Sequence, residues 1–247
     1  MTLPLDGRVI LVTGAAKRIG RGIALHLAKH GARVAIHYST SEAEARATTE
    51  ECNNTSQFKD TPIFQANLEH VSEIESLFDR VHAHFGRIDG LVNNAARFTQ
   101  IDPLKVTEAD WDFIHSVNLK ATFFCCQQAA RRMLNTPEGG RIVNISSLGG
   151  LQPWANHSHY CASKAGVIML TKALAKAFAP KVTVNSVAPG VIPFGEHDAR
   201  ITRLIAATPA GRAGTAEEIA EAVTFFLTSP DFITGQIMSV DGGLGLK

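Results

Sequence analysis

The chain lacks the features that mark secreted and membrane-bound proteins. Only four cysteines occur in 247 residues, none in a Cys-x-x-Cys pair, and so few thiols favour a reducing cytoplasm over a disulfide scaffold. No apolar run approaches the roughly 18 residues that span a bilayer. Residues 1–8 lack the charged-then-apolar order of a signal peptide. We therefore expect a cytoplasmic protein with no membrane partner.

An excess of charge of one sign is also absent. Lys and Arg number 24 against 23 Asp and Glu, a formal net charge of +1, and no dense basic block appears. The sequence thus predicts no nucleic-acid partner. Ten histidines include the pairs His82-x-His84 and His157-x-His159, but neither pair is joined by suitably spaced cysteine or carboxylate ligands. We interpret them as ordinary surface histidines and predict no metal site.

Short β-branched runs alternate with longer segments of helical periodicity. We expect strands at residues 8–13, 33–38, 62–66, 90–92, 141–146, 182–187 and 237–240, and helices at residues 19–30, 41–52, 71–85, 111–134, 160–179, 197–207 and 215–228. Strands separated by helices pair in parallel through right-handed crossovers. The pattern predicts an α/β fold, a doubly wound Rossmann domain whose mostly parallel seven-stranded sheet has helices on both faces. Since no linker interrupts the chain, residues 1–247 are expected to form a single domain.

Tyr160 and Lys164 are the residues most suggestive of chemistry. Four positions apart on an expected helix, they share one face and lie close enough to interact. A nearby ammonium favours the phenolate form of a tyrosine, so the pair is a candidate proton donor and acceptor. The spacing alone also fits two unrelated surface residues, and its meaning depends on what surrounds it.

A glycine-containing turn joins the first expected strand to the first helix, at Thr13-Gly-Ala-Ala-Lys-Arg-Ile-Gly20. Glycines there let the backbone approach a pyrophosphate, and the helix N-terminus supplies free N–H groups. An NAD site usually has a carboxylate at the end of the second strand, but here residues 37–41 contain none, and the first carboxylate after the strand is Glu42. Lys17 and Arg18 with the nearby hydroxyls suit a 2′-phosphate, so the sequence favours NADP(H). The same polar residues could simply cap the next helix.

From end to end, the chain resembles the short-chain dehydrogenase/reductase family. The resemblance rests on segments that occur in the family's order on the expected elements: Thr13-Gly-x-x-x-x-Ile-Gly20, Asn93-Asn-Ala-Ala96, Val-Asn118-Leu, Ser147 thirteen residues before Tyr160, Asn185-Ser-Val-Ala-Pro189-Gly190 and Val240-Asp-Gly-Gly243.

This resemblance implies a catalytic set and a cofactor. Tyr160 would protonate the substrate oxygen while NADPH gives hydride to its carbon, and Lys164 would lower the pKa of Tyr160 and hold the nicotinamide ribose. Ser147 would orient the carbonyl, and Asn118 would position a water. The implied NADP(H)-binding residues are Gly14, Lys17, Arg18, Ile19, Gly20, His37, Tyr38, Ser39, Thr40, Asn67, Leu68, Asn94, Ala95, Ala96, Tyr160, Lys164, Pro189, Gly190 and Ile192. The resemblance also implies a homotetramer.

A narrower likeness points to the pteridine reductase branch. Arg18 replaces the usual middle glycine of the turn, and Phe98 falls where that branch places a ring against a pterin. However, the branch tends to carry Asp where this chain has Ser147, and Arg97 and Asn67 also depart from the expected pattern. We expect Phe98, Ser147 and Tyr160 to contact the substrate.

Three functions follow, in order of preference. The first is NADPH-dependent reduction of a carbonyl on a small substrate. The second is reduction of a dihydropterin or dihydrofolate. The third, a non-catalytic NADP(H)-binding redox sensor, predicts loss of catalytic side chains, yet Asn118, Ser147, Tyr160 and Lys164 are all present.

Overall fold

Seven parallel strands form one sheet in the computed structural model, which describes residues 3–196 and 198–246. Their spatial order is β3-β2-β1-β4-β5-β6-β7, and every described neighbouring pair is parallel. The strands are β1 (Val9–Val12), β2 (Arg33–Tyr38), β3 (Ile63–Gln65), β4 (Gly90–Asn93), β5 (Gly140–Ile145), β6 (Val182–Pro189) and β7 (Ile237–Val240). The predicted α/β fold with helices on both faces is confirmed.

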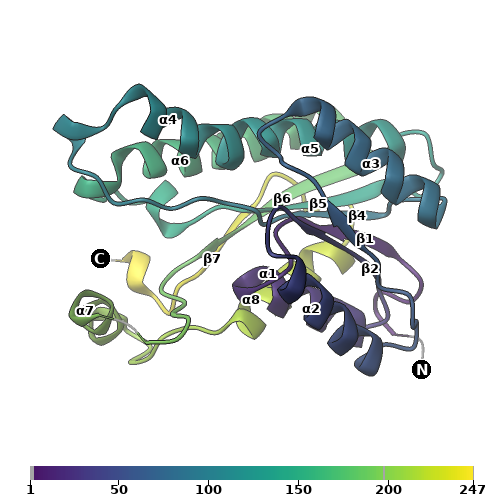
Figure 1. Cartoon of the computed structure of the whole chain (residues 1–247), viewed down its shortest axis with the longest axis horizontal. Coiled ribbons are helices and arrows are strands. Elements are labelled where there is room, and N and C mark those ends of the chain that lie inside the picture. Colours follow the sequence, from purple (N-terminus) through teal and green to yellow (C-terminus); the bar gives the residue numbers. More distant parts are fainter. Residues whose placement is uncertain (1–2, 197, 247) are drawn as a thin grey trace.

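Helices cover both faces of this sheet (Figure 1). On one face lie α3 (Val71–Phe85), α4 (Glu108–His115), α5 (Thr122–Met133) and α6 (Ser158–Phe178), and on the other lie α1 (Arg18–Lys29), α2 (Glu42–Thr55) and α8 (Ala216–Thr228). The short helix α7 (Ala199–Ala207) stands apart, beside the C-terminal end of the chain. In the described part of the chain, no helix is long and apolar enough to cross a membrane.

Two apolar clusters hold the layers together, one on each side of the sheet. β1 alternates between them: Ile10 and Val12 pack toward α1 and α8, whereas Val9 and Leu11 pack toward α3 and α5. All four side chains are buried because a parallel strand is covered on both faces. The strand therefore has an uninterrupted apolar sequence.

The helix predicted at residues 111–134 differs from the observed one. It begins earlier, at Glu108, because Thr107 and Asp110 form a capping box at its N-terminus. It is then interrupted by a π-helical segment, Ser116–Ala121, before α5 continues to Met133. The helix predicted at residues 197–207 begins at Ala199, where Asp198 caps it, and residue 197 lies outside the described residues.

Short 3-10 segments occupy Pro103–Lys105, Leu148–Gly150, Ala155–His157 and Leu244–Leu246. Chain order reverses between β1 and β4, which are neighbours in the sheet although β2 and β3 separate them in sequence. Ligands of doubly wound sheets bind in the crevice at the carboxyl ends of the strands at such a point.

Candidate active site

A cavity of about 530 Å³ opens at the carboxyl ends of β1, β2 and β4. The turn between β1 and α1 forms one wall of it, and the segment after β4 forms another. Gly20 is required where these two segments meet, because a Cβ there would lie 2.2 Å from Gly14 O and 2.5 Å from Asn94 Nδ2. The cavity has the position and the glycine-built wall that a dinucleotide needs.

The buried ring of His37 holds the glycine turn in place. Its Nδ1 accepts a hydrogen bond from Gly14 N (3.0 Å), and its Nε2 donates to Ala66 O (3.1 Å). Burial lowers the pKa of His37 to about 4, so the ring is neutral at pH 7. We predicted that His37 binds the cofactor. The residue lines the cavity, and both of its ring nitrogens bond to the protein itself, so the ring also positions the turn.

Arg18 has a left-handed backbone, with φ of 55°. Among the residues that the structure describes, it is the one non-glycine residue with positive φ. Its exposed side chain lines the cavity, whereas the neighbouring Lys17 pairs with Glu44 at 3.7 Å. A strained residue kept at a site wall points to a role for its side chain.

Tyr160 and Lys164 lie on one face of α6, as predicted, but both are buried. Lys164 Nζ is 6.0 Å from the centre of the Tyr160 ring and donates to Ile145 O at 2.8 Å. Burial lowers the pKa of Lys164 to about 8. Burial also raises the pKa of Tyr160 to about 12, and the adjacent Ser147 hydroxyl acts in the opposite direction.

The net shift of the tyrosine pKa is upward. Lys164 was expected to lower the pKa of Tyr160, but removing the phenolate from water raises it by more than the Ser147 hydroxyl lowers it. Tyr160 therefore remains protonated at neutral pH and can donate a proton.

Asn118 lies in the π-helical segment behind the tyrosine. Its Oδ1 accepts from Arg97 N (2.7 Å), and its Nδ2 donates to Arg97 O (3.0 Å) and to Ser163 Oγ (3.1 Å). The side chain thereby connects the segment after β4 to α6, so it fixes the distance between the two walls of the site. π-Helical turns are frequent at functional sites.

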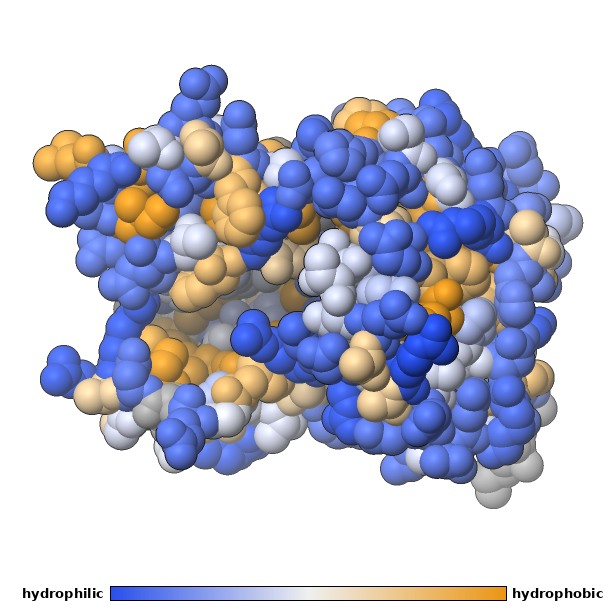
Figure 2. All heavy atoms as spheres, viewed as in Figure 1, coloured by the Kyte–Doolittle hydropathy of each residue, from blue (hydrophilic) through white to orange (hydrophobic). Residues whose placement is uncertain are grey.

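A second cavity of about 640 Å³ adjoins Tyr160 on the side away from the glycine turn. Figure 2 shows the molecule hollowed between the helices of one face and α7, with apolar residues along the hollow. Phe98 is 56% exposed and meets the Tyr160 ring edge to face, with centroids 4.8 Å apart. Trp154 stacks parallel to Tyr160 at 6.1 Å. This cavity presents an aromatic wall to a substrate.

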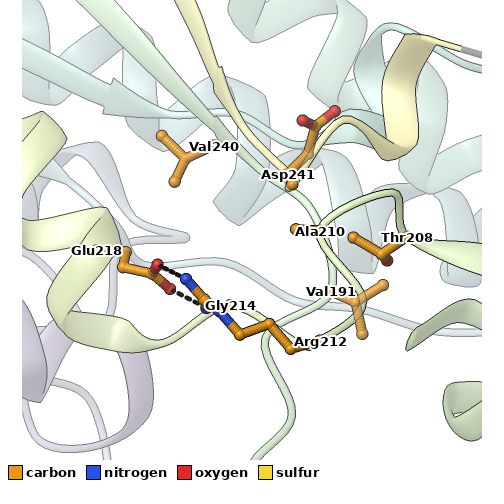
Figure 3. A pocket seen from close by; sticks show the side chains of 9 residues that line it. Val191, Thr208, Ala210, Arg212, Gly214, Glu218, Val240 and Asp241 are labelled. Carbon is orange, nitrogen blue, oxygen red and sulfur yellow. Dashed lines mark hydrogen bonds and ion pairs between the residues drawn. The ribbon is translucent and has the colours of Figure 1, made fainter. Parts of the chain in front are cut away.

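The segment from Val191 to Gly214 carries α7 and several residues that line this cavity, and its two ends lie side by side. Gly214 N donates to Val191 O at 3.0 Å, which joins the two ends of the segment. Figure 3 shows a small cavity at this junction, where Arg212 and Glu218 form an ion pair and the Asp241 carboxylate points away from it. Asp241 accepts two backbone N–H groups of the C-terminal turn, at 2.9 and 2.8 Å. Because these charges are already paired, we interpret the junction as a fixed base for the loop.

Most of the predicted residues meet at these two cavities. Those lining the first are Gly14, Lys17, Arg18, Ile19, Gly20, His37, Tyr38, Ser39, Thr40, Asn67, Leu68, Asn94, Ala95, Ala96, Tyr160 and Ile192. Phe98, Ser147 and Tyr160 line the second, as does Gly190. Asn118, Lys164 and Pro189 line neither.

The sequence reasoning missed several residues that line the cavities. Val117 and Phe194 line the first, and Trp154, His157 and Arg200 line the second. The aromatic residues before the Tyr160 helix were a usable signal, whereas Arg200 lies in a segment with no distinctive pattern.

Known proteins resemble the chain over nearly its whole length. The profile of the family described as "Enoyl-(Acyl carrier protein) reductase" matches residues 14–245. A 3-oxoacyl-[acyl-carrier-protein] reductase of Staphylococcus aureus is 38% identical over 240 residues, covering 95% of this chain and 96% of the relative. A short-chain type dehydrogenase/reductase of Picea abies is 35% identical over 252 residues, covering 97% and 93%. The chain belongs to the short-chain dehydrogenase/reductase family.

Solved structures agree with this membership. A putative short-chain alcohol dehydrogenase from Sinorhizobium meliloti matches with a TM-score of 0.91 at 33% identity, covering 97% of each chain. A mutant of the Serratia marcescens short-chain dehydrogenase/reductase matches with the same TM-score at 31% identity, covering 98% of this chain and 99% of the other. This short-chain dehydrogenase/reductase is thus an oxidoreductase. Within residues 3–196 and 198–246, no group of three or more His, Cys, Asp or Glu side chains could hold a metal ion.

Proposed function

We propose that the chain is an NADPH-dependent reductase that transfers hydride to a carbonyl of a small substrate, with Tyr160 as proton donor. One observation carries the proposal: Tyr160 lines both cavities and has the hydroxyl of Ser147 beside it. A carbonyl oxygen bound there would meet two hydroxyl donors at the boundary between the cofactor cavity and the substrate cavity.

The residues of the first cavity fit NADP(H). The glycine turn and the N-terminus of α1 would hold the pyrophosphate, and Arg18 with Ser39 and Thr40 would hold the 2′-phosphate. No Asp or Glu lines this cavity in the described part of the chain, so nothing there repels a phosphate. Bound NADPH supplies the hydride.

The protein's own groups manage the proton and the developing charge. Tyr160, protonated at neutral pH, donates to the substrate oxygen, and the Ser147 hydroxyl orients that oxygen. The buried ammonium of Lys164 stabilises the phenolate that forms, because opposite charges attract strongly away from water. The three hydrogen bonds of Asn118 hold the segment after β4, through Arg97, at a fixed distance from α6, through Ser163.

Replacing Tyr160 by Phe tests the proton donor. We expect kcat to fall about 10²- to 10⁴-fold, the usual contribution of a general acid, while NADPH affinity stays within a few-fold of the wild type. Stopped-flow measurement of NADPH oxidation and a separate NADPH titration give the two values. Unchanged turnover would refute the role of Tyr160 as proton donor, whereas a wild type that binds NADPH but reduces no carbonyl would favour the redox-sensor alternative.

A substrate screen separates the two enzymatic alternatives. Several curated relatives are 3-oxoacyl-[acyl-carrier-protein] reductases, so we propose 3-oxoacyl thioesters as the first carbonyl substrates to test. Reduction of a dihydropterin is second: the left-handed Arg18 and the exposed Phe98 ring beside Tyr160 favour it. NADPH oxidation should be compared with a 3-oxoacyl thioester, simple ketones and dihydrobiopterin. Turnover of the pterin alone contradicts carbonyl reduction.

We also propose that the chain forms a single domain, assembles as a homotetramer and works in the cytoplasm. Support for assembly comes from large apolar side chains left exposed on α4, α5, α6 and α8: Trp111, Phe113, Phe123, Met169 and Phe225. Support for a reducing compartment comes from the four cysteines, which are all free. Sedimentation velocity tests the oligomer, and a monomer at micromolar concentration would contradict it.

A further inference from the structure

The substrate cavity carries a positive charge that two ring side chains, Phe98 and His157, separate from Tyr160. Arg200, near the start of α7, is the one charged side chain among the cavity's lining residues in the described part of the chain. A series of contacts connects Tyr160 to Arg200. The ring centroids of Tyr160 and Phe98 are 4.8 Å apart, and those of Phe98 and His157, which stack, are 4.7 Å apart. His157 Nε2 lies 2.8 Å from Arg200 Nη2.

Both groups that hold this guanidinium are neutral. Arg200 Nη1 donates to the amide oxygen of Gln100 at 2.7 Å. The Nδ1 of His157 lies 2.9 Å from the Thr99 carbonyl oxygen, so it carries the proton and leaves Nε2 as the acceptor for Arg200. Burial lowers the pKa of His157, which keeps the ring uncharged.

The carboxylate nearest to Arg200 in sequence, that of Asp198, is used to cap α7. Asp198 caps α7 by accepting the backbone N–H groups of Arg200 and Ile201, at 3.0 and 2.9 Å. Ion pairs of the described residues neutralise eight other arginines, whereas none involves Arg200. Its two hydrogen bonds use two of the five N–H donors of a guanidinium. The remaining N–H donors of the Arg200 guanidinium are therefore available to a ligand in the cavity.

We propose that the carbonyl substrate carries a carboxylate, which pairs with Arg200 while the carbonyl lies against Ser147 and Tyr160. The aromatic wall between these two ends would hold the apolar middle of the substrate. A guanidinium held in one orientation by neutral acceptors matches the planar fork of a carboxylate. The inference rests on the proposed reductase function. The competing interpretation is that Arg200 only fastens α7 to the loop carrying Gln100.

Matched acid and amide substrates distinguish these interpretations. The pairs are 4-acetylbenzoate with 4-acetylbenzamide, which is rigid, and 6-oxoheptanoate with its amide, which is flexible. We expect the wild type to prefer the acid in at least one pair, by about tenfold or more in kcat/KM, because hydrogen bonds to charged groups are the stronger ones. The preference should weaken as salt rises. Equal kcat/KM for acid and amide in both pairs would overturn the proposal.

Two variants of α7 locate the effect. Arg200→Gln removes the charge, and we expect kcat/KM for the acid to fall about tenfold or more, with the amide within threefold of the wild type. Arg203→Gln is the control, because Arg203 is exposed on the same helix and does not line the cavity. It should leave both substrates unchanged. Equal losses for acid and amide in the Arg200→Gln variant would show a fastening role only.

Binding gives a readout that does not depend on turnover. Isothermal titration calorimetry of 4-acetylbenzoate should show binding at least tenfold weaker to the Arg200→Gln variant than to the wild type, with no such change for 4-acetylbenzamide. If this holds while no carbonyl is reduced, the carboxylate site stands and the proposed reaction fails. If acid and amide bind the wild type equally, the carboxylate site fails, whether or not the enzyme reduces ketones.

Discussion

Replacing Arg18 by glycine should have two opposite effects: it should leave the fold as stable or slightly more stable, and it should weaken NADPH binding. Its φ of 55° is costly for a residue with a Cβ, by about 1–2 kcal/mol. Glycine removes that strain but makes the unfolded chain more flexible, which costs about 0.4–1 kcal/mol. We expect the free energy of unfolding to stay unchanged or to rise by about 1 kcal/mol, measured by urea denaturation.

The same substitution should weaken NADPH binding selectively. The Arg18 side chain lines the cofactor cavity and has no hydrogen bond or ion pair with any described residue. Its charge-assisted bonds to a 2′-phosphate should contribute about 1.5–3 kcal/mol, so NADPH should bind the Arg18→Gly variant about 10- to 150-fold more weakly. NADH has no such phosphate, and its Kd should stay within about twofold of the wild-type value.

Titration calorimetry gives the Kd of each variant for NADPH and for NADH, and urea denaturation gives its free energy of unfolding. Arg21→Gln is the matched control, since Arg21 also belongs to α1 but pairs with Glu51 and does not line the cavity. Arg18→Ala should lose NADPH affinity without the relief of strain. If the Arg18→Gly variant kept its NADPH affinity, or lost NADPH and NADH affinity equally, the assignment of Arg18 to the 2′-phosphate would be refuted.

Three further substitutions test the buried groups of the site. Lys164→Met should abolish reduction yet raise the free energy of unfolding at pH 7 by roughly 1–2 kcal/mol. Burial lowers the pKa of Lys164 from 10.5 to about 8, a shift worth about 3 kcal/mol, but the Ile145 carbonyl loses its donor, which costs about 1–3 kcal/mol. This gain should shrink between pH 8 and 10.5 in chemical denaturation, as the folded wild type sheds the proton that its unfolded chain retains. For His37, whose pKa falls from 6.5 to about 4, wild-type stability should drop by about 3 kcal/mol as the pH falls from 6.5 to 4. A similar drop in the His37→Gln variant would assign it to other groups. Ser147→Ala should lower kcat by roughly 10²-fold with little change in NADPH affinity, and a change in NADPH affinity alone would contradict its place beside the substrate.

Local patterns of the sequence located most of the sheet. The predicted strands overlap all seven observed ones, since strands of a covered parallel sheet, such as β1, form short runs of mostly apolar residues. The glycine turn could also be predicted from the sequence, because Gly20 lies at a position where no Cβ fits. The π-helical segment at Ser116–Ala121 was not, because its residues also suit an ordinary helix and the deviation accompanies long-range bonds such as Asn118 to Ser163.

The sequence by itself determined the family, the order of strands and helices, and which residue types could transfer a proton. Only the tertiary structure decided how those groups behave. Burial raises the pKa of Tyr160 and lowers that of Lys164, and burial is a property of the packed molecule. Arg200 meets Gln100 across 100 residues of sequence. A contact over that distance leaves no local pattern, because it exists only once the chain has folded.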